Sequence, residues 1–275
     1  MALKLENLQV SGSFKARGAS NALASLPAAT LDRGVVTASG GNHGLGVAQA
    51  AWRAGVPATI YLGRNAPPVK AERLALWGAT VVTEGAGWDE ANAAALARAE
   101  ADDLAYVHPF ADPAVIAGQG TVALEILDDA PETEVILVPI GGGGLIAGVA
   151  AAAKARKPPT RIIGVEPEGA PTLKNSRAAG RVIALDGVAT EANTLAPRRS
   201  AQINLDLIAA HVDDIVLVSD EAMRAAARWL WLEMGVAAEL AGAATSAALI
   251  AGAYRPLGGE AVCAVVSGTG TAGMN

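Results

Sequence analysis

Short apolar runs alternate along the chain with longer stretches of helical periodicity. The runs are rich in valine and isoleucine and hold few charges, as do strands buried on both faces of a parallel sheet. Strands are expected at residues 34–39, 58–62, 79–83, 104–109, 134–140, 161–167, 213–219 and 260–268. Helices are expected at residues 43–55, 69–78, 89–101, 114–129, 144–155, 220–235 and 239–252. This alternation predicts an α/β fold with parallel sheets covered by helices on both faces.

One segment interrupts the alternation. Residues 167–210 are rich in turn-forming residues, and we expect them to wrap the surface or to form an interface. Residues 135–153 carry no charge and reach the length of a membrane span, but Pro139 and the glycines after it divide them. They are better interpreted as a buried strand, a loop and a buried helix. Ser219 or Asp220 can cap the helix over 220–235.

The composition is that of a globular protein acting on small molecules. Of 275 residues, 52% are hydrophobic and 17% are charged, which allows a large core. The formal net charge of −6 argues against nucleic acid or an anionic membrane as a partner. The single cysteine, Cys263, excludes an internal disulfide, and its apolar neighbours predict a buried thiol. No signal peptide is recognisable at the N-terminus, so we expect a cytoplasmic protein.

The strongest candidate for a phosphate site is the run from Pro139 to Gly148, in which glycines join an expected strand to an expected helix. Glycine lets the backbone approach an anion, and a helix N-terminus favours negative charge. The glycines are Gly141, Gly142, Gly143 and Gly144. No Lys-Ser/Thr pair follows them, which excludes a P-loop. A dinucleotide-binding loop stays open, because Gly142, Gly144 and Ala147 fit that spacing and Glu166 could bind a ribose.

Three further loops hold candidate chemistry. In "SGGNHGLG", residues 39–46, Ser39, Gly40 and Gly41 can offer N–H groups to a carboxylate. Asn42 suits either a helix cap or a ligand donor, and His43 is better interpreted as a packed histidine than as a catalytic base. In "VVSGTGTAG", residues 265–273, a hydroxyl stands where open α/β sheets bind ligands. The opening "SGSFKARG", residues 11–18, places a lysine beside an aromatic ring.

These four loops, in this order, resemble those of the fold-type II pyridoxal-phosphate enzymes, specifically the serine/threonine dehydratase group that includes serine racemase. The resemblance rests on "KLENLQVSGSFKARGASNAL", "SGGNHGLGVAQAA", "GGGGLIAG", "IAGQGT" and "GVEPEGAP", and it runs through the whole chain. It implies a fold like that of the tryptophan synthase β-subunit, with two open parallel-sheet α/β domains and the cofactor between them. Residues 34–111 would form a small movable domain. Residues 1–33 and 112–275 would form a large domain, without the further segment that the family has before Lys4.

The resemblance also implies a role for each matching residue. Lys15 would hold pyridoxal 5'-phosphate through an imine and act as the base at the substrate Cα, and Phe14 would pack on the pyridine ring. The remaining cofactor contacts would come from Asn42 at the phenolic oxygen, Gly141 to Gly144 and Leu145 at the phosphate, Ser267 at the pyridine nitrogen, and Glu239 nearby. The substrate carboxylate pocket would be lined by Ser39, Gly40, Gly41, Asn42 and His43.

The site residues indicate the type of reaction. A serine hydroxyl such as Ser267 is a poor acid and leaves the pyridine nitrogen neutral, which favours elimination over transamination. Gly40 stands where the group's racemases have a serine, so racemisation is not favoured. Thr172 replaces an aspartate of the family's cation site, so no metal is expected, although a weakly bound ion at Glu166 stays open. "SGTGT" and "ELAGA" also depart from the usual motifs around Ser267 and Glu239.

We therefore expect a homodimeric lyase that dehydrates L-threonine, L-serine or both to a 2-oxo acid and ammonia. Alternatives within the family are a 3-hydroxyaspartate or other hydroxyamino-acid dehydratase, or an amino-acid racemase. Alternatives outside it are an NAD-binding oxidoreductase that uses the glycine loop, and an inactive relic of the fold. The expected partner is a small amino acid, with neither nucleic acid nor membrane involved.

Overall fold

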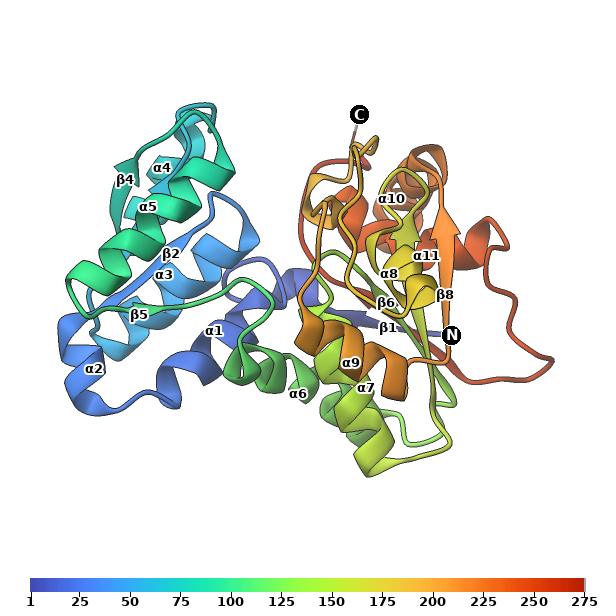
Figure 1. Ribbon diagram of the computed structural model, residues 1–275. Helices are drawn as coiled ribbons and strands as arrows, with labels where there is room; N and C mark the ends of the chain where they lie inside the picture. Colours follow the sequence, from blue (N-terminus) through green and yellow to red (C-terminus); the bar gives the residue numbers. More distant parts are fainter. Residues whose placement is uncertain (275) are drawn as a thin grey trace. The chain divides into compact units, whose positions relative to one another are not determined.

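The computed structural model describes residues 1–274, and the chain divides into two compact units. Unit 1 comprises Met1–Phe14 and the chain from Gln119 on, and unit 2 comprises Lys15–Gly118. Both have the parallel α/β architecture that the alternation of strands and helices predicts (Figure 1). The expected small domain at 34–111 lies inside unit 2, and its movement stays a prediction. None of the helices described here has the length and apolarity needed to cross a membrane.

Unit 1 is built on a five-stranded sheet in the order β1-β9-β6-β7-β8, and every strand pair described in it is parallel. Its elements are β1 (Ala2–Leu5), η1 (Glu6–Leu8), β6 (Val135–Pro139), α7 (Gly144–Arg156), β7 (Arg161–Pro167), α8 (Thr172–Ala179), η2 (Asn193–Leu195), α9 (Gln202–His211), β8 (Asp214–Val218), α10 (Asp220–Met234), α11 (Leu240–Ile250) and β9 (Val262–Val266). The helix α6 (Pro113–Asp129) begins in unit 2 and continues into unit 1.

Successive residues of the β6 strand face opposite sides of the sheet, as a strand's period of two requires. Ile136 and Val138 pack with α7 and α9, whereas Val135 and Leu137 pack with α10 and α11. These buried aliphatic side chains form the two cores of unit 1, and each fully buried one stabilises the fold by roughly 2 kcal/mol.

Unit 2 is built on a four-stranded parallel sheet in the order β4-β3-β2-β5. Its elements are α1 (Lys15–Ala24), α2 (Ala28–Arg33), β2 (Val35–Ala38), α3 (Asn42–Ala54), β3 (Ala58–Leu62), α4 (Pro68–Ala75), β4 (Thr80–Thr83), α5 (Trp88–Ala101) and β5 (Ala105–Tyr106). Val35 and Ile60 pack with α1 and α3 on one face, and Val36 and Tyr61 pack with α5 on the other. Unit 2 therefore has its own cores, one on each side of its sheet.

Several sequence expectations are settled by the backbone and by burial. Ser219 caps α10, because its Oγ accepts the N–H of Ala222 at 3.1 Å. The Cys263 thiol is buried in β9 as predicted, and burial raises its pKa to about 11. The expectation that residues 167–210 wrap the surface or form an interface is wrong in part, because α8 and α9 form within them and Leu205 and Ile208 of α9 enter the core.

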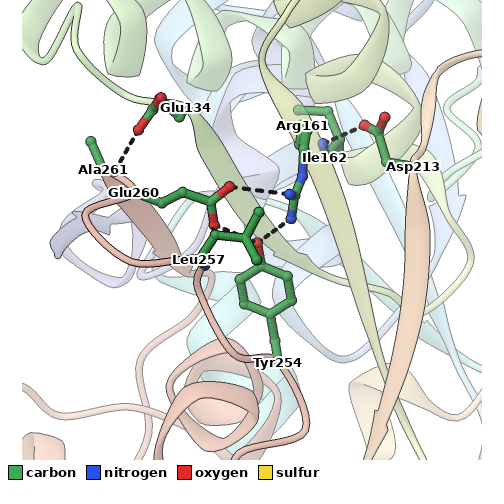
Figure 2. A network of polar contacts seen from close by, with 8 residues as sticks. All are labelled: Glu134, Arg161, Ile162, Asp213, Tyr254, Leu257, Glu260 and Ala261. Atoms are coloured by element: carbon green, nitrogen blue, oxygen red, sulfur yellow. Dashed lines mark hydrogen bonds and ion pairs between the residues drawn. The ribbon is translucent and has the colours of Figure 1, made fainter.

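The amino edge of the unit 1 sheet is held by a polar network centred on Arg161 (Figure 2). The Arg161 guanidinium donates to Glu260 Oε1 at 3.1 Å and to the hydroxyl of Tyr254. Glu260 Oε2 also accepts the N–H of Leu257 at 2.8 Å, so the loop between α11 and β9 is fastened to the start of β7. Separate carboxylates, Glu134 and Asp213, accept N–H groups at the starts of β9 and β7.

Replacing Tyr254 by phenylalanine is expected to lower the free energy of unfolding by about 1–2 kcal/mol. The change removes the hydroxyl that accepts from Arg161 and leaves a partly buried cation with one bond fewer. Urea unfolding measures the loss. Tyr61→Phe is the control, since the Tyr61 hydroxyl has no hydrogen bond among residues 1–274. Equal stability of both variants and the unmodified protein would contradict a structural role for the network.

Candidate active site

Two glycines of the loop between β6 and α7, Gly141 and Gly143, are closely packed. Gly143 has φ of 93°, in the left-handed region, and a Cβ there would lie 2.6 Å from Leu173 Cδ1. A Cβ on Gly141 would lie 2.6 Å from the carbonyl oxygen of Thr194. The loop therefore needs glycine both for its backbone conformation and for its close contacts.

The peptide between Gly142 and Gly143 has a defined orientation. The Gly142 carbonyl oxygen accepts Ser200 Oγ at 2.8 Å and Asn204 Nδ2 at 2.7 Å. In a trans peptide the N–H points away from the C=O, so the Gly143 N–H faces away from these two side chains. The first amides of α7, including that of Leu145, have no acceptor within the helix. Together these N–H groups and the helix dipole form a cradle for an anion.

The end of β9 lies against the opening segment of the chain. The Phe14 N–H donates to the carbonyl oxygen of Ser267 at 3.1 Å, and the Thr269 N–H donates to that of Gly12 at 2.8 Å. Ser267 is buried, and its hydroxyl donates to the carbonyl oxygen of Ala241 across a long 3.4 Å. This weak hydrogen bond leaves the Ser267 proton available to a better acceptor.

Glu239 links the β9 end to the glycine loop. It is the N-cap residue of α11, and its N–H donates to the carbonyl oxygen of Gly268 at 3.2 Å. Its Oε1 accepts Thr194 Oγ1 at 3.3 Å, and Thr194 is the residue whose carbonyl packs on Gly141. Unit 1 thus brings together the predicted residues Phe14, Gly141, Gly142, Gly143, Gly144, Leu145, Glu239 and Ser267.

Lys15 is the first residue of α1, not part of a loop as the surrounding glycines suggested. Its Nζ donates to the carbonyl oxygen of Pro109 at 2.5 Å. Gly46 of α3 packs directly on the Lys15 backbone, because a Cβ at position 46 would lie 2.9 Å from the Lys15 carbonyl carbon and oxygen. Close helix packing therefore fixes the Lys15 backbone, and a backbone carbonyl orients its amine.

The predicted carboxylate loop turns directly into α3. Gly41 is the N-cap residue of this helix and Asn42 its first residue, so Asn42 is not the cap. Ser39 Oγ accepts the N–H of Gly41 at 3.3 Å, which closes the turn. A Cβ on Gly40 would lie 3.0 Å from both Leu62 Cδ2 and Lys70 Cδ, so this position is already crowded.

His43 is buried and serves as a neutral, hydrogen-bonded histidine. Its Nε2 lies 3.0 Å from the carbonyl oxygen of Val107 and 3.1 Å from Thr37 Oγ1. Burial first, and then the charge of Lys15, lower the pKa of His43 to about 3. The imidazole therefore stays uncharged near neutral pH and is a weak base. Unit 2 holds the predicted residues Lys15, Ser39, Gly40, Gly41, Asn42 and His43; their contacts with substrate stay predictions.

Glu166 binds the N-terminus of a helix. Its Oε1 accepts the N–H of Leu173 at 2.7 Å and its Oε2 accepts that of Lys174 at 2.9 Å, both in the first turn of α8. This is the alternative in which the carboxylate satisfies polar groups at a strand end. No cluster of three or more His, Cys, Asp or Glu side chains able to hold a metal ion occurs among residues 1–274. Burial raises the pKa of Glu166 to about 7.

The stability of the protein is expected to fall as the pH rises from 4.5 to 7, through Glu166. The pKa of about 7 in the folded state exceeds the ordinary glutamate value of 4.5, so the folded state holds more protons than the unfolded state in this window. Glu166 contributes on the order of 3 kcal/mol to the free energy of unfolding below pH 4.5. This contribution is lost as the pH rises through 7. Urea unfolding across this window should give a flatter profile for Glu166→Gln, with the exposed Glu132→Gln as control. Parallel profiles for Glu166→Gln and the unmodified protein would contradict the prediction.

Residues 1–268 match the family described as pyridoxal-phosphate dependent enzyme. The chain belongs to this family. The matched residues 1–268 include three of the four loops and the first four residues of the loop at 265–273. This membership favours pyridoxal phosphate over a nicotinamide nucleotide at the glycine loop. The tomato (Solanum lycopersicum) structure of processed threonine deaminase isoform 2 superposes with a TM-score of 0.94 at 37% identity, covering 98% of this chain and 74% of that one. The fold-type II architecture is thereby confirmed.

Curated relatives within the family include lyases and racemases. The chain is 44% identical over 266 residues to the L-threonine ammonia-lyase of Thermotoga maritima, covering 97% of this chain and 66% of that protein. It is 39% identical over 252 residues to a serine racemase of Oryza sativa subsp. indica, covering 92% of this chain and 74% of that protein. The chain thus spans just under two thirds of the length of the ammonia-lyase.

Pyridoxal phosphate is the cofactor of this family, and the residues of the glycine loop fit its phosphate. The Gly142 carbonyl oxygen accepts from both Ser200 and Asn204, and the N–H of the same peptide points to the other side, where an anion requires donors. An aldehyde needs a primary amine to form an imine, and Lys15 has one; that Lys15 holds the cofactor stays a prediction. Residues that sequence reasoning missed are Thr194, Ser200 and Asn204 behind the loop and Pro109 at the amine; none belongs to a motif.

Proposed function

We propose that the chain binds pyridoxal phosphate and dehydrates L-threonine, L-serine or both to a 2-oxo acid and ammonia. The observation that carries the proposal is the attachment of Lys15 to Phe14. Lys15 follows Phe14 in the chain, so its Cα stays about 3.8 Å from that of Phe14 whatever the arrangement of the units. The Phe14 N–H donates a hydrogen bond to the carbonyl oxygen of Ser267. Lys15 is therefore one residue away from Phe14 and Ser267, the two residues predicted to contact the pyridine ring.

Each group of residues then has a chemical task. The cradle of Gly141 to Gly144 and Leu145 binds the phosphate, and Phe14 and Asn42 orient the ring. The amides of residues 39–43 hold the substrate carboxylate. When bound, pyridoxal phosphate supplies an electron sink that stabilises negative charge at the substrate Cα. Lys15 accepts the Cα proton as general base, because its amine is already directed and partly shielded from water.

The elimination balances without another reactant. The substrate loses the Cα proton and the Cβ hydroxyl, which leaves as water after it gains a proton. The released enamine takes up one water, and the products are a 2-oxo acid and ammonia. Ser267 supports this outcome, since a hydroxyl does not protonate the ring nitrogen and transamination is disfavoured. Gly40, which has no side chain, supplies no second acid for racemisation. The relative named L-threonine ammonia-lyase supports threonine as a substrate.

The proposal is tested with the purified chain and added pyridoxal phosphate. We expect a near-visible absorbance band, a cofactor mass on the Lys15 peptide after borohydride reduction, and 2-oxo acid release from L-threonine or L-serine. Serine enantiomers and 3-hydroxyaspartate, assayed in parallel, separate the racemase and the other dehydratases. A chain that folds but takes up no cofactor would contradict the proposal. A homodimer, a cytoplasmic location and the absence of nucleic-acid and membrane partners stay predictions.

A further inference from the structure

The Lys15 amine is held by a backbone carbonyl in a short connection between β5 and α6. We call residues 108–112, with the sequence HPFAD, the 108–112 loop. Lys15 Nζ donates to the carbonyl oxygen of Pro109 at 2.5 Å, and Pro109 is buried. A carbonyl oxygen accepts a hydrogen bond but takes no proton at neutral pH, so this contact orients the amine without consuming it.

Two side chains of the loop fix the position of the Pro109 carbonyl. His108 Nδ1 accepts the N–H of Phe110 at 3.1 Å and that of Ala111 at 2.9 Å, which folds the loop back on itself. Asp112 Oδ1 accepts the N–H of Ala114 at 2.7 Å at the start of α6. Pro109 therefore lies between a histidine that closes the turn and an aspartate that fastens its end.

The protonation state of His108 suits this task. With two N–H donors on Nδ1, the ring proton must be on Nε2. Burial, followed by the positive charge of Lys15, lowers the pKa of His108 to about 4, while Asp112 raises it to a smaller extent. The Nδ1 lone pair is thus retained near neutral pH. The Phe110 ring packs edge-on against the imidazole at 4.7 Å between centroids and limits its rotation.

The backbone of Lys15, the donor in the hydrogen bond to Pro109, is also held in place. The first turns of α1 pack against glycines of two helices, Gly46 of α3 and Gly118 of α6. A Cβ on Gly118 would lie 2.7 Å from the Arg17 carbonyl oxygen and from Gly18 Cα. The backbone is therefore held in place at both residues of the hydrogen bond, Lys15 and Pro109.

We propose that His108 is a positioning residue that holds the Pro109 carbonyl as the resting acceptor for the Lys15 amine. The inference rests on the proposed function, because the amine must wait in a defined place whenever it is not covalently engaged. An amine held in one orientation reaches the incoming aldehyde or substrate without an orientational search. Loss of the His108 acceptor would free the loop and slow the covalent capture of the cofactor.

Two amide replacements of His108 test whether an acceptor at the Nδ1 position is needed or whether any polar side chain is enough. In His108→Asn the side-chain oxygen can occupy the Nδ1 position and accept from Phe110 and Ala111. In His108→Gln the amide reaches the Nε2 position instead and leaves both N–H groups without that acceptor. The quantity to measure is the initial rate at which pyridoxal phosphate is captured. Captured cofactor is trapped with borohydride and quantified on the Lys15 peptide by mass spectrometry. His211→Gln, on the half-buried histidine at the end of α9, is the control.

The expected rate falls about tenfold for His108→Gln, stays within about threefold of the unmodified rate for His108→Asn, and is unchanged for His211→Gln. Equal rates for the two His108 variants would overturn the inference. If His108→Gln does not fold, amide hydrogen exchange is the test. We expect the Phe110 and Ala111 amides to be protected from exchange in the unmodified chain and in His108→Asn. Rapid exchange of these amides in either protein would also overturn the inference. Absence of capture by the unmodified chain would instead contradict the proposed function.

Discussion

Lys15→Ala is expected to abolish covalent capture of pyridoxal phosphate and to lower 2-oxo acid release from L-threonine by at least about a thousandfold. The amine has two tasks in the proposed reaction, attachment of the cofactor and removal of the Cα proton, and general base catalysis alone typically contributes about 10²–10⁴-fold. Turnover is followed by 2-oxo acid production at saturating cofactor. Attachment is followed by borohydride trapping and peptide mass.

The matched control for this variant is Lys157→Ala. The Lys157 amine also donates to backbone carbonyls, to Pro131 at 2.7 Å and Thr133 at 2.9 Å, at the amino edge of the unit 1 sheet. Removing it deletes the same kind of contact without touching the glycine loop or the 39–43 segment. We expect full turnover in Lys157→Ala. Substantial turnover in Lys15→Ala, or equal losses in both variants, would refute the assignment of Lys15.

Gly44→Ala is expected to lower the stability of the chain by about 3 kcal/mol and to weaken substrate binding. A Cβ on Gly44 would lie 1.9 Å from the Ser39 carbonyl oxygen and 3.3 Å from Leu74 Cδ2. Overpacking typically costs about 1–3 kcal/mol, and here the nearest atom is backbone that cannot rotate aside. The gain in helix propensity, about 1 kcal/mol, does not offset this. Relief requires movement of the Ser39 to Asn42 turn.

Urea unfolding gives the stability of Gly44→Ala, and KM for L-threonine reports on the turn. Gly187→Ala is the control, because a Cβ at this exposed glycine has no neighbour within 4 Å. We expect the control to unfold like the unmodified chain and to keep its KM. A Gly44→Ala protein with unchanged stability and unchanged KM would show that the turn is not held by this contact.

The strands were predictable where burial dictates composition. Buried parallel strands must be apolar throughout, and β3 and β7 have the bounds that their runs of aliphatic residues indicate. The short β1 was not recognised, because four residues that include Lys4 give too little pattern. Helix α9 was hidden in a segment dominated by turn residues. It is defined by packing of Leu205 and Ile208 against the sheet and not by a long periodic stretch.

In the candidate site, too, features with a local sequence pattern were predictable and features that depend on the tertiary fold were not. Glycine at four successive positions between a strand and a helix is a recognisable pattern, so the sequence predicts an anion site there. The acceptor of the Lys15 amine is a backbone carbonyl, and every residue has one, so no pattern could distinguish Pro109. The support behind the glycine loop comes from Ser200 and Asn204, about 60 positions further along the chain, and only the tertiary fold reveals it.

The pairing of β1 with β9 joins the first strand of the described chain to the last, whereas unit 2 is a single continuous stretch. A ribosome synthesises from the N-terminus, so residues 15–118 emerge complete while β9 is still untranslated. Unit 2 can therefore acquire its structure during synthesis, with α1 packed on α3. The sheet of unit 1 must wait for its final strand, so β1 stays without its β9 partner until nearly the whole sequence has been made.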